Sequence, residues 1–121
     1  MRNNYVFLRG TLKKVTDRSI VNPINMVEVR FNLSTGQSDS DQDHLVIGYS
    51  KLAIDVIAAD KAQLLPVECL VEGWLQSSEG HSWVVAQEVT LHLGRNDRKR
   101  LRWEIERFKM DLQAKDSLER L

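Results

Sequence analysis

A run of basic residues near the end of the chain is the strongest candidate for binding a charged partner. The cations lie close together and are followed by an aromatic ring: Arg95, Arg98, Lys99, Arg100, Arg102 and then Trp103. Clustered cations attract phosphate groups or an anionic membrane surface. At the start of a helix they also oppose the helix dipole, at roughly a few tenths of a kcal/mol each, which favours a functional reason for them. The alternative is a solvated helix start without a partner.

The side chains that usually perform catalysis or bind metals are scattered in this sequence. His44, His81 and His92 fall at a strand start, in a turn and within a strand, without metal-ligand spacing. Aspartates alternate in residues 39–43, but the glycine and the closing glutamate of a calcium loop do not follow. No nucleophile motif or glycine-rich phosphate loop accompanies them. We therefore predict a protein that is not an enzyme and that has no metal site and no cofactor.

Cys69 is the only cysteine, so the chain cannot form an internal disulfide or a cysteine-based zinc site. It alternates with Val67 and Val71, which predicts a small core residue rather than a reactive thiol. No stretch approaches the run of about 18 apolar residues that a membrane-spanning helix needs. Residues 1–4 lead into a strand-like segment without a signal-peptide region, so we expect a cytoplasmic protein.

Charge is unevenly distributed along the chain, although 17 Lys and Arg balance 17 Asp and Glu. Residues 1–94 carry 8 basic and 11 acidic residues, a net charge of −3. Residues 95–121 carry 9 basic and 6 acidic residues, a net charge of +3. Proteins that bind nucleic acid usually have a basic surface, because phosphate neutralisation supplies much of their affinity. By this count only the C-terminal segment has that property.

The hydrophobic pattern of the first 94 residues predicts five short strands. Alternation of apolar and polar residues places them at residues 4–12, 26–33, 44–50, 67–75 and 83–93. Helical spacing predicts a short helix over residues 51–61. Polar composition predicts loops over residues 13–25, which end in a turn at 22–25, and over residues 34–43. A hairpin turn is predicted at residues 77–80. This order is typical of a mainly β fold, the five-stranded OB barrel with a helix between its third and fourth strands.

The last 27 residues, 95–121, predict a charged amphipathic helix appended to a barrel domain of residues 1–94. Its apolar stripe consists of Leu101, Ile105, Phe108 and Leu112. Lys115 occupies the next position of the stripe, so we do not expect a long coiled coil.

Four segments resemble the bacterial single-stranded DNA-binding protein family. Residues 4–12 are similar to its Asn-x-Val-x-Leu-x-Gly-x-Leu opening and residues 27–33 to its Val-x-Val-x-Phe-x-Leu strand. Residues 44–53 resemble its His-x-Val-x-x-aromatic-x-Lys-Leu-Ala stretch, and residues 69–75 its fourth strand with Glu-Gly-x-Leu. Primosomal replication proteins share this barrel and are a close second match. The chain is also similar in size to divergent members from cyanobacteria and plastids, some of which are thylakoid-associated.

The resemblance implies single-stranded DNA as the partner, assembly into a dimer or tetramer, and contact with replication proteins. It does not extend to most of the family's base-stacking aromatics. Tyr49 stands where one stacking Phe lies, whereas Asp43 and Gly80 occupy or adjoin positions where the family has rings. Residues 34–43 contain no aromatic, and residues 115–121 lack the family's acidic partner-binding tail.

Candidate DNA contacts combine cations for the phosphates with rings for the bases. They are Arg30, Tyr49, Lys51, Trp74 and Trp83 on the barrel, and Arg98, Lys99 and Arg100 at the helix start. Trp74 and Trp83 are predicted to be neighbours across the hairpin. They either stack on bases or form a packing pair, or lie under the C-terminal helix, and these alternatives stay open.

Two apolar surfaces of the predicted barrel need cover. If Val46 faces inward, then Leu45, Ile47 and Tyr49 form an outer row. The candidates for this cover are the stripe of the C-terminal helix and a second subunit, and we expect the helix to pack on the barrel or across a dimer. Residues 5 and 7 also point outward, and the family pairs this strand with its own copy, so the resemblance implies an oligomer interface at Tyr5 and Phe7.

The sequence thus predicts a non-enzymatic single-stranded DNA-binding protein that uses the outer face of its barrel and the basic helix start. The alternative is an OB module that contacts proteins in a replication or membrane-associated complex and binds DNA weakly or not at all. A peripheral position at a thylakoid membrane is the second location that remains open.

Overall fold

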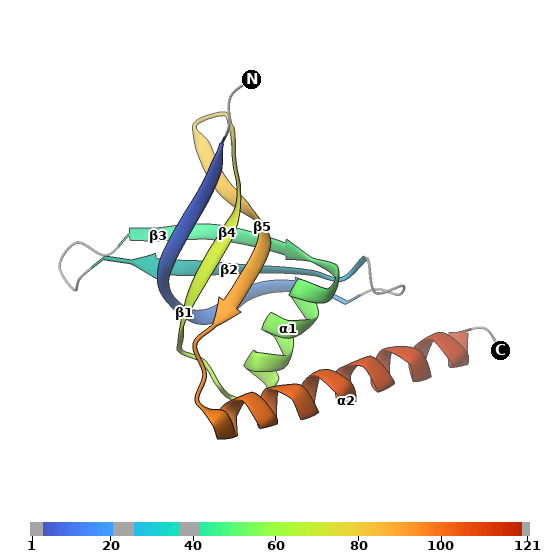
Figure 1. Cartoon of the computed structure of the whole chain (residues 1–121). Helices are drawn as coiled ribbons and strands as arrows, with labels where there is room; N and C mark the ends of the chain where they lie inside the picture. Colours follow the sequence, from blue (N-terminus) through green and yellow to red (C-terminus); the bar gives the residue numbers. More distant parts are fainter. Residues whose placement is uncertain (1–3, 21–25, 37–41, 120–121) are drawn as a thin grey trace.

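Five strands form a closed barrel in the computed structural model, which describes residues 4–20, 26–36 and 42–119. The elements are β1 (Tyr5–Ser19), β2 (Glu28–Thr35), β3 (Gln42–Tyr49), α1 (Ser50–Lys61), β4 (Val67–Ser78), β5 (His81–Leu91) and α2 (Arg95–Glu119). The strand order around the barrel is β1-β2-β3-β5-β4 (Figure 1). The predicted fold, a mainly β OB barrel with one helix before the fourth strand and one at the C-terminus, is confirmed.

β1 is longer than the predicted strand, because it continues through residues 13–19. Its first half, Tyr5–Leu12, pairs with β4, and its second half, Thr11–Ser19, pairs with β2. The prediction of a loop over residues 13–19 is therefore wrong. Pairing with β2 is made by the backbone, and it does not require the alternating apolar pattern that identifies a half-buried strand.

Gly10 lies where β1 passes from one partner strand to the other. A Cβ at this position would overlap the backbone carbonyl of Ser34 and would lie 3.1 Å from Cγ2 of Thr35. The register shifts twice just beyond it, after Leu12 and after Val15. Glycine is therefore needed at position 10 because β2 approaches β1 too closely for a side chain.

The remaining strand boundaries differ from the predicted ones by three residues at most. The predicted hairpin turn is a two-residue turn at Glu79 and Gly80, whose φ angles are both positive, 52° and 82°. The turn predicted at residues 22–25 and the alternating Asp39 and Asp41 lie outside the described residues.

The barrel interior is closed at one end by α1, which follows β3 directly. Val27, Val29, Phe31 and Leu33 of the second predicted strand all point into the core and are fully buried. α1 adds Ala53, Ile54, Val56 and Ile57 to the same cluster. Cys69 is fully buried there, as predicted, and burial raises the pKa of its thiol to about 11.

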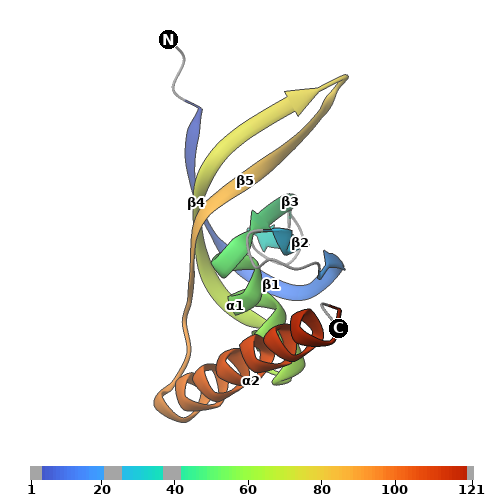
Figure 2. The ribbon, with the colours of Figure 1, turned by 90° about the vertical axis from the view of Figure 1, so that its right-hand side faces the viewer.

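α2 packs against α1 at the end of the barrel, as Figure 2 shows. Phe108 and Leu112 are 3% and 4% exposed and belong to the same hydrophobic cluster as the barrel core. The ammonium group of Lys61 on α1 lies 4.4 Å from the centroid of the Phe108 ring. The apolar stripe of α2 therefore serves to join the two helices.

α2 packs on the barrel domain, one of the two arrangements expected from the sequence, but it does so through α1 rather than over β3. Ile47 of β3 pairs with Arg30 on β2 and with Val85 on β5, and it is only 7% exposed. Leu45 is half-buried. Because a barrel strand has a neighbour on each side, side chains of the adjoining strands lie beside this row, and the row needs no helix over it.

Candidate nucleic-acid interface

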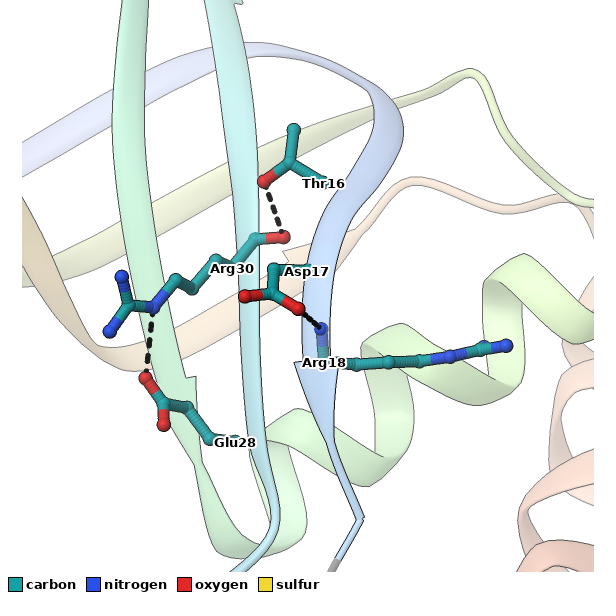
Figure 3. A network of polar contacts seen from close by, with 5 residues as sticks. All are labelled: Thr16, Asp17, Arg18, Glu28 and Arg30. Atoms are coloured by element: carbon teal, nitrogen blue, oxygen red, sulfur yellow. Dashed lines mark hydrogen bonds and ion pairs between the residues drawn. The ribbon is translucent and has the colours of Figure 1, made fainter.

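Arg30 projects from the middle of β2 on the outside of the barrel (Figure 3). Its Nε donates a hydrogen bond to Oε1 of Glu28 over 3.0 Å, and Thr16 Oγ1 donates to its backbone carbonyl over 3.0 Å. Nearly half of the Arg30 side chain is exposed. An exposed ion pair of this kind is weak, so a phosphate can compete with Glu28 for the guanidinium.

Tyr49 stands at the corner where β3 becomes α1. It pairs with Glu28 on β2, so it lies one diagonal step from Arg30. Its side chain is 46% exposed, and its extended backbone (φ −130°, ψ 161°) forms the N-cap position of α1. Lys51 follows in the first turn of α1, where its charge reaches the carboxyl of Asp55. Arg30, Tyr49 and Lys51 thus form one exposed group, here called the corner site.

Trp74 and Trp83 lie on the two neighbouring strands of the hairpin, but not directly opposite one another. The two-residue turn places Ser78 opposite His81, and counting back along the hairpin places Trp83 opposite Gln76 and Trp74 opposite Val85. The two tryptophans are therefore one diagonal step apart. The ring of Trp74 packs edge-on against Tyr5 of β1, with 5.1 Å between the centroids.

Tyr5, Phe7 and Trp74 form an aromatic cluster on the outer face of β1 and β4. The centroids of Tyr5 and Phe7 are 5.3 Å apart, and Phe7 is 64% exposed. Tyr5 Oη donates to Oε2 of Glu72 over 3.2 Å. Desolvation, this hydrogen bond and the nearby carboxylates of Glu72 and Glu88 raise the pKa of Tyr5. The cluster is an apolar surface with an acidic margin.

The barrel candidates do not form one continuous surface. β3 and β5 run parallel, with Val46 opposite Val84 and Ile47 opposite Val85. Tyr49 therefore lies at one end of β3, and Trp83 lies on β5 toward the other end. The corner site is cationic with one ring, whereas the β4–β5 hairpin carries two tryptophans without a basic neighbour in the ladder.

The basic residues of α2 lie at a third location, beside the C-terminal end of α1. Arg100 donates a hydrogen bond to the carbonyl oxygen of Ala62 and is 3.6 Å from a carboxylate oxygen of Asp97. Arg98 Nε donates to the carbonyl oxygen of Leu93 over 3.1 Å. α1 has 12 residues and therefore spans about 18 Å, which separates these cations from the corner site.

Trp103 was not among the predicted site residues, although it is 63% exposed. Arg107, one turn later, places its guanidinium carbon 5.3 Å from the ring centroid. Helical spacing would have identified this ring, because Trp103 falls outside the stripe of Leu101, Ile105 and Phe108. An unburied tryptophan beside a basic run is a candidate for base stacking.

Within residues 4–20, 26–36 and 42–119, no group of three or more His, Cys, Asp or Glu side chains is arranged to hold a metal ion. In the same part of the chain, no helix is long and apolar enough to cross a membrane.

The barrel is similar to solved structures of single-stranded DNA-binding domains. The second such protein from Mycobacterium smegmatis matches with a TM-score of 0.62 and 17% identity, over 78% of this chain and 97% of that one. The corresponding domain from Synechococcus matches with a TM-score of 0.58 and 17% identity, over 76% and 98%. The N-terminal domain of PriB from Thermoanaerobacter, described as dimeric, matches with a TM-score of 0.54 and 15% identity, over 77% and 100%.

These likenesses establish the fold, and they confirm at the level of the fold the resemblance that the sequence motifs indicate. The part of the chain that they leave uncovered is about as long as α2. No protein-family model matches the sequence. No curated protein matches it either.

Proposed function

We propose that the chain is a non-enzymatic protein that binds single-stranded DNA on the outside of its barrel. The observation that carries the proposal is the corner site, where exposed Tyr49 lies one diagonal step from Arg30 on the neighbouring strand and two residues before Lys51. A ring for the base and cations for the phosphates are the two components of sequence-independent strand binding. The structural neighbours that are single-stranded DNA-binding proteins support this proposal.

The same proposal includes a homodimer formed through the aromatic cluster. Phe7 is exposed on β1 beside Tyr5, and a neighbour with this fold is described as dimeric. A cytoplasmic location and contact with replication proteins are the remaining parts of the proposal.

A second candidate function follows from the charge of the barrel. Residues 1–94 have a net charge of −3, Arg30 is paired with Glu28, and Lys51 is near Asp55. An acidic barrel with neutralised cations favours a protein-interaction module that binds DNA weakly or not at all. Whether such a module belongs to a replication complex or to a membrane-associated one depends on its partner.

A titration distinguishes the two candidates. Labelled oligo-dT is titrated with the full chain at low and moderate salt, and binding is followed by anisotropy. Strand binding should weaken steeply with salt, because each neutralised phosphate releases counterions. The variant Tyr49→Ala should weaken binding by about tenfold, since one stacked base contributes 1–3 kcal/mol.

The matched control is Met110→Ala, because Met110 is 67% exposed and lies on α2, away from the corner site. Absence of binding at low salt would favour the protein-interaction module. Equal effects of the two substitutions would place the DNA elsewhere on the surface.

A further inference from the structure

A groove of about 460 Å³ lies between the end of α1 and the first turns of α2. Lys61 lines it from the last turn of α1, and Ala62 and Gln63 line it just after that helix ends. Lys99, Arg100 and Trp103 line it from α2. It is at the opposite end of α1 from the corner site. Because α2 packs on α1 through Phe108 and Leu112, both walls of the groove are held in place by the core.

The groove is basic although the barrel is acidic. Three cations and one carboxylate, that of Glu104, line it. Arg100 is bonded to Ala62 and to Asp97, so its position is fixed by the protein itself. Lys99, in contrast, is exposed and makes no hydrogen bond or ion pair with any residue that the structure describes. Its charge is available to an anion that enters the groove.

Trp103 supplies an aromatic wall for the same groove. The ring is 63% exposed, and Arg107 lies over it without burying it. A large ring left in solvent contributes nothing to the core, where Phe108 and Leu112 already fill the contact with α1. A ring beside the unpaired ammonium of Lys99 matches the combination of base and phosphate in one nucleotide.

A membrane surface fits the groove less well. Helices that lie on membranes insert a broad apolar face between the headgroups. In the apolar stripe of α2, Phe108 and Leu112 are instead buried in the core, and Leu101 and Ile105 are half-buried. Within residues 95–115 of α2, the large apolar side chains that remain exposed are Trp103 and Met110.

We propose that the α1–α2 groove holds one nucleotide of a single strand, with its base on Trp103 and its phosphate against Lys99 and Lys61. This inference rests on the proposed function and adds a second contact to it. The corner site and the groove are joined by α1, so a strand that binds both must follow this helix for about 18 Å. The DNA strand is then bound at both the corner site and the groove.

Separate tryptophan reporters test the proposal, because the chain has only three tryptophans. The double variant Trp74→Phe/Trp83→Phe leaves Trp103 as the sole fluorophore, and Trp103→Phe leaves the two on the barrel. Both proteins are titrated with oligo-dT of roughly 16 nucleotides, the upper site size of one OB fold. Anisotropy of the labelled strand is recorded in parallel. Quenching of Trp103 in the double variant is the expected result.

The outcomes separate this proposal from the proposed function. If the strand binds by anisotropy but the Trp103 signal does not change, the groove proposal is overturned and DNA binding stands. If neither anisotropy nor fluorescence responds, both proposals fail. If only Trp103 responds and Tyr49→Ala has no effect, the groove binds the strand and the corner site does not.

A pair of charge variants tests the phosphate contact. Lys99→Gln should lower the slope of log affinity against log salt by about 1. Lys115→Gln makes the same change of charge on the same helix, about 24 Å farther along, and should leave the slope unaltered. Equal changes of the salt slope in the two variants would overturn the proposed contact, because the charge of Lys99 would then act only through the overall electrostatic field of the helix.

A last experiment adds vesicles of phosphatidylserine and phosphatidylcholine to the Trp74→Phe/Trp83→Phe variant and records the fluorescence of Trp103. A blue shift of Trp103 with vesicles and no response to oligo-dT would overturn the proposal in favour of a membrane surface.

Discussion

The guanidinium of Arg100 on α2 donates a hydrogen bond to the carbonyl oxygen of Ala62, the residue that ends α1. Carbonyls at the end of a helix lack an amide partner within the helix. A cation is also favourable there because it lies at the negative end of the helix dipole. Arg100 therefore caps one helix from the other and fixes the position at which they meet.

Replacing Arg100 with Met should lower the free energy of unfolding by about 1 kcal/mol, since the hydrogen bond is charged but exposed. Arg102→Met is the matched control, because Arg102 is exposed and has no hydrogen-bond or ion-pair partner among the described residues. Urea denaturation of the two variants measures the difference. If both lose the same stability, the contact with Ala62 contributes nothing.

Gly73 is the position on β4 where a methyl group should be least tolerated. A Cβ there would overlap the carbonyl oxygen of Val85 and lie 2.9 Å from the Cα of Ala86, beside a register shift. We expect Gly73→Ala to destabilise the barrel by about 1–3 kcal/mol, because backbone atoms cannot move aside cheaply. Gly94→Ala is the control, since a Cβ at Gly94 meets no atom within 4 Å. A similar melting temperature for both variants would contradict this account.

Gln63 follows the end of α1 with a φ of 59°, a conformation that suits glycine. The amides of Gln63 and Leu64 bond back to the carbonyls of Asp60 and Ala59, as in a Schellman motif. Gln63→Gly should raise the free energy of unfolding by about 0.5–1 kcal/mol, because it removes the left-handed strain. Gln63→Ala keeps the strain and should bring no gain. Thermal unfolding of both variants decides the point, and equal gains would mean that the side chain, not the backbone, was unfavourable.

Asp55 makes the stability of the helix pair depend on pH. Burial raises the pKa of this carboxyl, and Lys109 and Lys51 partly oppose the shift. Because the folded pKa lies above the unfolded value of 3.8, the protonated form stabilises the fold below pH 3.8. That contribution is lost as pH rises through the folded pKa.

Asp55→Asn imitates the protonated carboxyl, so its melting temperature should exceed that of the parent increasingly as pH rises from about 3.8. Glu68→Gln is the control, because Glu68 is exposed on β4 and has no ion-pair partner among the described residues. A constant difference between Asp55→Asn and the parent across this range would rule out the linkage.

Phe7 should govern self-association if the proposed dimer uses the aromatic cluster. Phe7→Asp places a charge at a position that is 64% exposed in the single chain, so the fold should persist while the dimer dissociates. Met110→Asp introduces the same charge at another exposed apolar residue on α2. Sedimentation should show loss of the dimer for Phe7→Asp alone. A dimer that survives this change lies on a different surface.

The order of the barrel elements could be predicted because burial imposes a pattern on the sequence. Val27, Val29, Phe31 and Leu33 alternate with polar residues, and all four are fully buried. Residues 13–19 form a strand by backbone pairing and leave no such pattern. Strand propensity and alternation report burial on one face, so a strand exposed on most of its length cannot be recognised from them.

The candidate site could be predicted only in part. Exposure of Tyr49 and Trp74 follows from alternation, and both are 46% exposed. The contact of Trp74 with Tyr5 depends on the pairing of β1 with β4, which connects residues far apart in the sequence. The stripe of α2 indicated that the helix packs on something, but not that α1 is the partner. Helical periodicity identifies which face of α2 is apolar, but the surface on which that face packs depends on the tertiary structure.

The pairing of β1 with β4 also sets the order of events during synthesis on the ribosome. Tyr5–Leu12 pairs with Val67–Trp74, so its partners follow it by 55 to 69 residues. At about 5–20 residues per second, the first half of β1 waits roughly 3 to 14 seconds for β4, its partner strand. During that interval its backbone groups and the Phe7 ring form an open edge that a second nascent chain can occupy. The strand proposed to join two finished subunits is thus also where premature assembly of unfinished ones would begin.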